Sequence, residues 1–366
     1  MASRKSRGAK HKGDRKMNET RGVTRRDILR MGSLAAAGFL AGGRAAAQGQ
    51  EPKAIDVHAH LWTDDYLDLM EKYGKKDVWV QRGKGAGMGE AEMQKRFAMM
   101  DSAGIGIQAL SICPQSPQFE DKAHAVTGAR KANDLYLEAV HKWPKRFVAY
   151  AAVPLPHVDE SLQEMDRVLG QPGMVGVTIP TSILERSIAD PAFMPVYEEL
   201  NRRGSVLFIH PGGYGAYTPL ISDYHITWMI GAPIEDTIAM THLIIRGIPQ
   251  KFPKLKIINT HLGGALPMLM QRMDNIYTWE DPSLTEKPSI TARRMWYDTV
   301  GHGYDPALKA AVDSIGADRL VFGTDFPYEP GPLFRRSIDY IHEVGMKQDD
   351  VERILHGTPA QLLGIA

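Results

Sequence analysis

From residue 54 onward, short apolar runs alternate with longer amphipathic segments eight times in succession. The runs are rich in Val, Ile, Leu and Phe without strict polar alternation, which is typical of parallel strands buried on both faces. They cover residues 54–60, 105–112, 147–153, 174–180, 205–210, 256–261, 295–299 and 319–325. The segments between them predict helices at 90–103, 120–143, 158–169, 190–203, 233–251, 265–277, 305–315 and 333–345, with a last helix at 348–363. This pattern predicts a single α/β domain with the fold of a (β/α)₈ TIM barrel.

Four of these runs end in side chains that bind metal ions. His58 and His60 close the first run, and residues two apart in a strand project from the same face. His210 and His261 end the fifth and sixth runs, and Asp325 ends the eighth. The active site of a barrel lies at the carboxyl ends of its strands, so we predict one mononuclear centre there for Zn²⁺, Mn²⁺ or Fe²⁺. The residues alone do not separate the roles of His210 and His261.

The connections at 61–90 and 211–232 are longer than the others. The first is rich in glycine and predicts a lid over the barrel mouth. The second carries several aromatic side chains, among them Trp228, and predicts a second wall of the pocket. After the seventh run, Asp298 is a candidate to orient a metal ligand, and His302 is a candidate to face the barrel mouth.

The order of these motifs resembles the decarboxylase-like branch of the amidohydrolase superfamily, across most of residues 54–364. The matching motifs are H-x-H at 58–60, F-I-H-P at 208–211, H-x-G-G at 261–264, Q-R-M-D-N at 271–275 and G-T-D-F-P at 323–327. The resemblance implies a metal-dependent barrel in which four side chains bind one divalent ion: His58, His60, His210 and Asp325. Zn²⁺ is the expected ion and Mn²⁺ the alternative. His261 would then be a catalytic base beside the ion, and not a ligand.

The same resemblance identifies side chains for a substrate. Arg272 matches a position that, in the family, reaches the site of a neighbouring subunit and holds a substrate carboxylate, which implies a homodimer. A surface ion pair is the alternative for this arginine. Trp228 matches a tryptophan of the pocket wall. The family also has an arginine in the loop after the first strand, for which Arg82 and Lys84 are the nearest candidates.

For function, the resemblance implies non-oxidative decarboxylation of a small unsaturated or aromatic carboxylic acid, with His261 and Asp325 as catalytic residues. Hydrolysis of a lactone, ester or amide is the alternative, because a metal-activated water serves that reaction with the same residues. A non-catalytic periplasmic binding protein is a more distant alternative. A protein that only binds its ligand does not need a base beside an open coordination position of the metal.

The first 47 residues differ from the rest. The pair Arg25 and Arg26 precedes a weakly apolar stretch at 33–43 and the small residues at 45–47. This order is typical of a twin-arginine export signal, and the apolar stretch is too short to span the ~30 Å hydrocarbon core. We therefore expect export to the periplasm and cleavage near Ala47, with 48–366 as the barrel domain.

Charge and cysteine content exclude several kinds of partner. Residues 1–47 hold 12 of the 44 Lys and Arg and 3 of the 43 Asp and Glu, which leaves 32 basic and 40 acidic residues in 48–366. A net charge near −8 in residues 48–366 does not attract nucleic acid or anionic lipid. Cys113 is the only cysteine, so no disulfide forms within the chain. The expected partner is a small-molecule carboxylate, with no nucleic acid and no membrane span.

If the export signal operates, changing Arg25 and Arg26 to Lys will retain the precursor in the cytoplasm, because the export route recognises the arginine pair. Fractionation of cells that express the variant or the parent chain measures this. Equal periplasmic yields of the two chains would exclude the twin-arginine route.

Overall fold

The computed structural model describes residues 53–365, so the predicted export signal lies outside the described residues and stays a prediction. Eight parallel strands form one sheet in the order β1-β2-β3-β4-β7-β8-β9-β10. Their bounds are β1 Ala54–His60, β2 Ile105–Ser111, β3 Phe147–Ala152, β4 Met174–Pro180, β7 Val206–His210, β8 Lys256–Asn259, β9 Trp296–Asp298 and β10 Leu320–Val321. A separate antiparallel pair is formed by β5 (Ser182–Ile183) and β6 (Arg186–Ser187).

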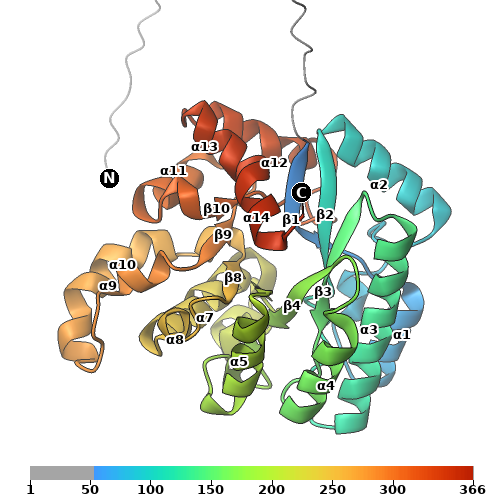
Figure 1. Cartoon of the computed structure of the whole chain (residues 1–366), viewed down its shortest axis with the longest axis horizontal. Helices are drawn as coiled ribbons and strands as arrows, with labels where there is room; N and C mark the ends of the chain where they lie inside the picture. The colour runs from blue at the N-terminus through green and yellow to red at the C-terminus, as the bar shows by residue number, and fades with distance from the viewer. Residues whose placement is uncertain (1–52, 366) are drawn as a thin grey trace, which may run out of the picture. The chain divides into compact units, whose positions relative to one another are not determined.

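Backbone hydrogen bonds between β1 and the chain after β10 close the sheet into a barrel. Val57 N donates to Phe322 O at 2.9 Å, and His60 N donates to Phe326 O at 2.8 Å. Asp325 N donates to His58 O at 2.9 Å between them. Helices lie outside the ring of strands (Figure 1). The predicted (β/α)₈ barrel is therefore confirmed.

Fourteen α-helices occur within residues 53–365. They are α1 Asp64–Lys72, α2 Glu90–Ser102, α3 Lys122–Lys142, α4 Val158–Val168, α5 Met194–Arg203, α6 Pro219–Ser222, α7 Ala232–Ile245, α8 Ile248–Lys251, α9 Leu266–Glu280, α10 Pro288–Ala292, α11 Asp305–Ser314, α12 Pro332–Glu343, α13 Gln348–Glu352 and α14 Thr358–Leu363. The last predicted helix is divided by a π-helical turn at Arg353–Gly357. Within these described residues, no helix is both long and apolar enough to cross a membrane.

Two strands end at least two residues earlier than the sequence predicted, and both differences concern the site. The sixth strand stops at Asn259 and the eighth at Val321, so His261 and Asp325 lie in the turns that follow. Their φ angles of 52° and 54° lie in the left-handed region, so neither residue can belong to a strand. The site therefore takes these two side chains from tight turns.

Apolar side chains form two clusters: a small inner cluster of strand residues with Leu362 and Leu363 of α14, and a larger outer cluster between strands and helices. Ile55 and Val57 belong to the inner cluster, and Ala59 belongs to the outer one. Strict alternation would turn the residue after Val57 outward. The pairing of β1 with β2 shifts register between Asp56 and Ala59, which turns His58 inward instead.

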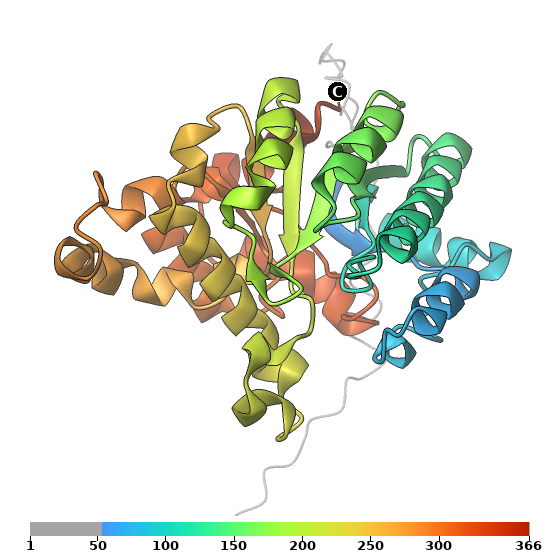
Figure 2. The ribbon, with the colours of Figure 1, turned by 90° about the horizontal axis from the view of Figure 1, so that it is seen from below.

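The two long connections flank the barrel mouth. The connection at 61–90 contains α1, a helix that the sequence analysis did not predict. The segment between β7 and α7 contains α6 and a π-helical turn at Thr227–Gly231. It extends beyond the strands and the surrounding helices (Figure 2).

Candidate metal centre

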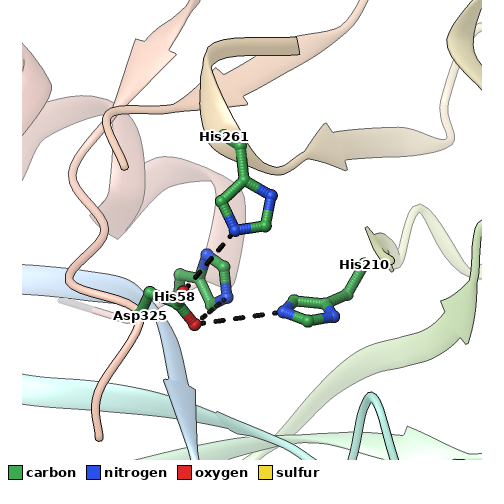
Figure 3. A group of neighbouring side chains, drawn as sticks. All are labelled: His58, His210, His261 and Asp325. Carbon is green, nitrogen blue, oxygen red and sulfur yellow. Dashed lines mark ion pairs between the residues drawn. The ribbon is translucent and has the colours of Figure 1, made fainter. Parts of the chain in front are cut away.

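Four side chains from four barrel elements converge at the carboxyl ends of the strands (Figure 3). His58 comes from β1, His210 ends β7, and His261 and Asp325 follow β8 and β10. One ligand atom of each lies within 4.8 Å of all the others. The barrel thus brings together residues that are up to 267 positions apart in the sequence.

The carboxylate of Asp325 lies at the centre of this group, and its two oxygens face different histidines. Oδ1 lies 3.1 Å from His58 Nε2, 3.0 Å from His60 Nε2 and 3.9 Å from His210 Nε2. Oδ2 lies 3.6 Å from His261 Nε2. The two ring nitrogens of His58 and His60 are 3.2 Å apart. The three predicted histidine ligands therefore share one oxygen, and His261 faces the other.

The other ring nitrogen of each histidine contacts a fixed acceptor. His58 Nδ1 lies 2.6 Å from Asp298 Oδ2, and His261 Nδ1 lies 2.8 Å from Asp236 Oδ2. His60 Nδ1 lies 3.2 Å from the carbonyl of Ser111, and His210 Nδ1 lies 2.8 Å from that of Pro211. Nδ1–H donation to these acceptors orients all four rings so that their Nε2 atoms face the centre.

Asp298 and Asp236 are both fully buried, and they also fix the turn that carries His261. Asp298 Oδ1 accepts a hydrogen bond from His261 N at 2.9 Å. Asp236 Oδ1 accepts one from Thr260 Oγ1 at 2.9 Å. The sequence analysis singled out Asp298 but missed Asp236, which lies inside α7. Its signal was a carboxylate on the apolar face of a helix.

Burial and charge set the protonation of the site in opposite directions. Burial lowers the pKa of His60 and holds that of His210 well below its usual value, so both rings stay neutral. Burial alone would lower the pKa of His58, but the charges of Asp325 and Asp298 raise it to about 9. Burial would likewise raise the pKa of Asp325, but the neighbouring histidines hold it well below its usual value. The carboxylates that favour a positive charge on His58 would equally favour a bound cation.

Two observations show that a divalent metal fits these residues. His210 Nε2 is buried and has no hydrogen-bond partner among the described residues, which is costly unless a cation binds it. Two ligand atoms ~2.1 Å from one ion lie ~3.0–3.4 Å apart at right to tetrahedral angles. The three separations among His58, His60 and Asp325 Oδ1 are 3.0, 3.1 and 3.2 Å. Imidazole and carboxylate together suit zinc and manganese.

A cavity of about 760 Å³ opens from this centre to the surface. His210, His261 and Asp325 line its inner end. Much of its wall is apolar and comes from residues that include Leu262, Pro267, Met268, Val300 and Ala307. A cavity of this size takes a small organic molecule and brings it to the histidines and the carboxylate.

The predicted substrate residues lie in different places relative to this cavity. Trp228 and Lys84 line it. Arg82 does not, because its guanidinium pairs with Asp68 at 2.6 Å and with Glu71 at 3.0 Å on the outer side of α1. Arg272 is exposed on α9 and is not part of the cavity wall of its own chain. Of the two basic candidates after β1, the structure brings only Lys84 to the cavity.

Comparison with known proteins finds a family and relatives that match most of the described residues. The family model described as Amidohydrolase matches residues 55–365. A 2-amino-3-carboxymuconate-6-semialdehyde decarboxylase of Dictyostelium discoideum is 27% identical over 334 residues, which cover 85% of this chain and 91% of that protein. A gamma-resorcylate decarboxylase of Rhizobium sp. (strain MTP-10005) is 30% identical over 254 residues, which cover 64% of this chain and 76% of that protein.

A solved structure shares the fold. It is a dihydroxybenzoic acid decarboxylase from Polaromonas sp. JS666 with bound manganese and the inhibitor 2-nitroresorcinol. It superposes with a TM-score of 0.73 at 25% sequence identity, and the match covers 85% of this chain and 97% of that one.

We expect the purified protein to bind about one divalent ion per chain through the N and O ligands described. The double variant His58→Ala, His60→Ala should lose the ion, because it removes two of the buried nitrogens that face Asp325. Elemental analysis by mass spectrometry measures the ratio. His141→Ala, at the exposed end of α3, is the matched control and should keep the ion. Full occupancy in the double variant would exclude His58 and His60 as ligands.

Proposed function

Because the chain belongs to the amidohydrolase family, we propose that it is a metal-dependent decarboxylase of small aromatic or unsaturated carboxylic acids. The observation that carries this proposal is the buried histidine and carboxylate centre at the inner end of a largely apolar cavity. Its relatives include enzymes named as decarboxylases of carboxymuconate semialdehyde, resorcylate and 6-methylsalicylic acid. Those substrates are flat, unsaturated acids of a size that the cavity accepts.

One divalent ion is proposed to bind at His58, His60, His210 and Asp325. The three nitrogens face Oδ1 of the carboxylate, which supports this set of ligands. Zinc and manganese both suit these donors, and the Polaromonas structure contains manganese. When bound, the ion would supply a Lewis acid that polarises an oxygen of the substrate or of water.

His261 is proposed to move the proton. Decarboxylation replaces CO₂ by a proton at the same carbon, so a proton donor must stand beside the substrate. His261 Nε2 lines the cavity, and Asp236 holds Nδ1 from behind. An imidazole supported in this way gives up and regains a proton at Nε2 without turning. Its place beside Oδ2 of Asp325 keeps it apart from the atoms that face Oδ1.

The outer part of the cavity is proposed to be completed by a second copy of the chain. Arg272 is exposed on α9 and forms no ion pair within residues 53–365. The same helix exposes 77% of Met268 and 71% of Trp279. Large apolar side chains exposed together are typical of a surface that a partner covers. A homodimer through this face would bring Arg272 to a neighbouring site, where it would hold a substrate carboxylate.

Product analysis tests the proposed function directly. Metal-loaded protein is incubated with hydroxylated benzoates, a muconate, and a lactone as the hydrolysis arm. We expect CO₂ from at least one acid, its loss after chelation, and its return with added Zn²⁺ or Mn²⁺. Acid release from the lactone without CO₂ from any carboxylate would show the hydrolase alternative instead.

His261→Asn separates a base from a ligand. If His261 transfers the proton, the variant should keep its ion and lose about 10²–10⁴ in kcat, the usual contribution of a positioned acid or base. Metal content and turnover are measured on the same sample. A variant that loses the ion first, and recovers turnover at high metal concentration, would make His261 a ligand.

Hybrid dimers test the role of Arg272. Arg272→Ala and the double variant His58→Ala, His60→Ala should each be inactive alone. In an equimolar mixture with random pairing, up to about a quarter of the parent activity should return, because hybrids join an intact metal site to a partner's intact Arg272. No recovery after demonstrated subunit exchange would contradict the shared site.

A further inference from the structure

His302 lines the same cavity as the metal centre, but it has no part in the chemistry proposed above. It follows β9, and solvent reaches 68% of its side chain. Its Nδ1 lies 3.0 Å from Oε1 of Glu329, a residue that is only 1% exposed. A buried carboxylate thus stands behind an imidazole that is open to the cavity.

The burial of Glu329 argues against an ordinary surface ion pair. Two exposed partners gain little from pairing, whereas burying a carboxylate is costly unless a cation or donors compensate for the lost water. Among the described residues Oε1 makes no hydrogen bond, so its ion-pair contact with His302 at 3.0 Å is what compensates for its burial. The contact with Glu329 raises the pKa of His302, although burial opposes it. The cost of burying the Glu329 carboxylate is explained if Glu329 positions His302 to bind a ligand in the cavity.

The backbone at His302 is also held in an unusual conformation. Its φ angle is 51°, in the left-handed region that a histidine adopts rarely and at some cost. The neighbours Gly301 and Gly303 allow the chain to turn tightly on either side. The turn places the imidazole on the cavity wall, among Val300, Gly301 and Tyr304.

Outside the metal centre, the charged or titratable nitrogens on the cavity wall belong to His302 and Lys84. Lys84 Nζ lies 5.5 Å from the centre of the Tyr328 ring. The carboxylate on this wall, that of Asp325, is already engaged by histidines. The polar part of the wall therefore favours a ligand with a negative oxygen in addition to the group that meets the metal centre.

We propose that His302, held by the buried Glu329, binds a second acidic oxygen of the substrate. The proposal rests on the proposed function and assigns the residue that recognises a further carboxylate or an acidic hydroxyl on the substrate acid. Glu329 is a positioning residue, because it acts on the ligand through His302. The imidazole Nε2–H donates to the oxygen, and the charge of Glu329 favours the protonated ring.

Binding of matched ligand pairs to the manganese-loaded protein tests this without turnover. Salicylate is compared with ortho-toluate, and isophthalate with meta-toluate, by titration calorimetry. Each pair differs by an acidic oxygen group against a methyl group, and the two pairs separate a hydroxyl from a second carboxylate. The parent protein should bind the oxygen member of at least one pair about tenfold more tightly, the usual effect of a hydrogen bond to a charged group.

His302→Asn should abolish this preference and leave the affinity for the methyl partner within about twofold. Asparagine tolerates the left-handed conformation, so the turn is kept. Glu329→Gln should reduce the preference in part, whereas a general loosening of the wall would weaken both members equally and leave the ratio unchanged. His225→Asn is the matched control: this exposed histidine has a φ angle of 56° and does not line the cavity.

The proposal is overturned if the parent protein prefers neither oxygen ligand, if His302→Asn keeps the preference, or if His225→Asn loses it too. These outcomes are independent of CO₂ release, so failure here leaves the proposed decarboxylation to be judged by its own assay.

Discussion

The carboxylate of Asp325 is the group on which the rest of the site depends. Its Oδ1 faces three histidine nitrogens and its Oδ2 faces a fourth, so one side chain orders the whole centre. The backbone of the same residue closes the barrel, because Asp325 N donates to His58 O. The hydrogen bond from the turn after β10 to β1 therefore both helps to close the barrel and sets the carboxylate opposite the β1 histidines.

Burial shifts the pKa values of this centre, and it also destabilises the fold wherever a buried polar group lacks a partner. His58, His60 and Asp298 are fully buried, and buried polar groups destabilise a fold unless each has a partner. The Nδ1 atoms of the four histidines have partners in Asp298, Asp236 and two backbone carbonyls. His210 Nε2 has no partner among the described residues. A bound cation would satisfy that nitrogen and would be stabilised by the carboxylates of Asp325 and Asp298.

The strands and the convergence of His58, His60, His210, His261 and Asp325 could be predicted, because buried parallel strands are continuously apolar and a barrel gathers their carboxyl ends. The tight turns at His261 and Asp325 could not, since a left-handed residue leaves no apolar pattern. The helix α1 was overlooked although Tyr66, Leu67 and Met70 have helical spacing. That helix supplies Asp68 and Glu71, which draw Arg82 away from the cavity. Glu329 acts through a spatial neighbour, so its sequence position alone carried no signal for a role. For Asp236 the only signal was a carboxylate on the apolar face of α7.

The central claim is that one ion is held by the nitrogens that face Oδ1 of Asp325, with His261 left free for proton transfer. Anomalous diffraction from crystals of the manganese-loaded protein tests this most directly. We expect one peak, at ~2.0–2.3 Å from Nε2 of His58, His60 and His210 and from Asp325 Oδ1, with His261 Nε2 outside bonding distance. A peak bonded to His261 with His60 left out, or two peaks in one site, would contradict it.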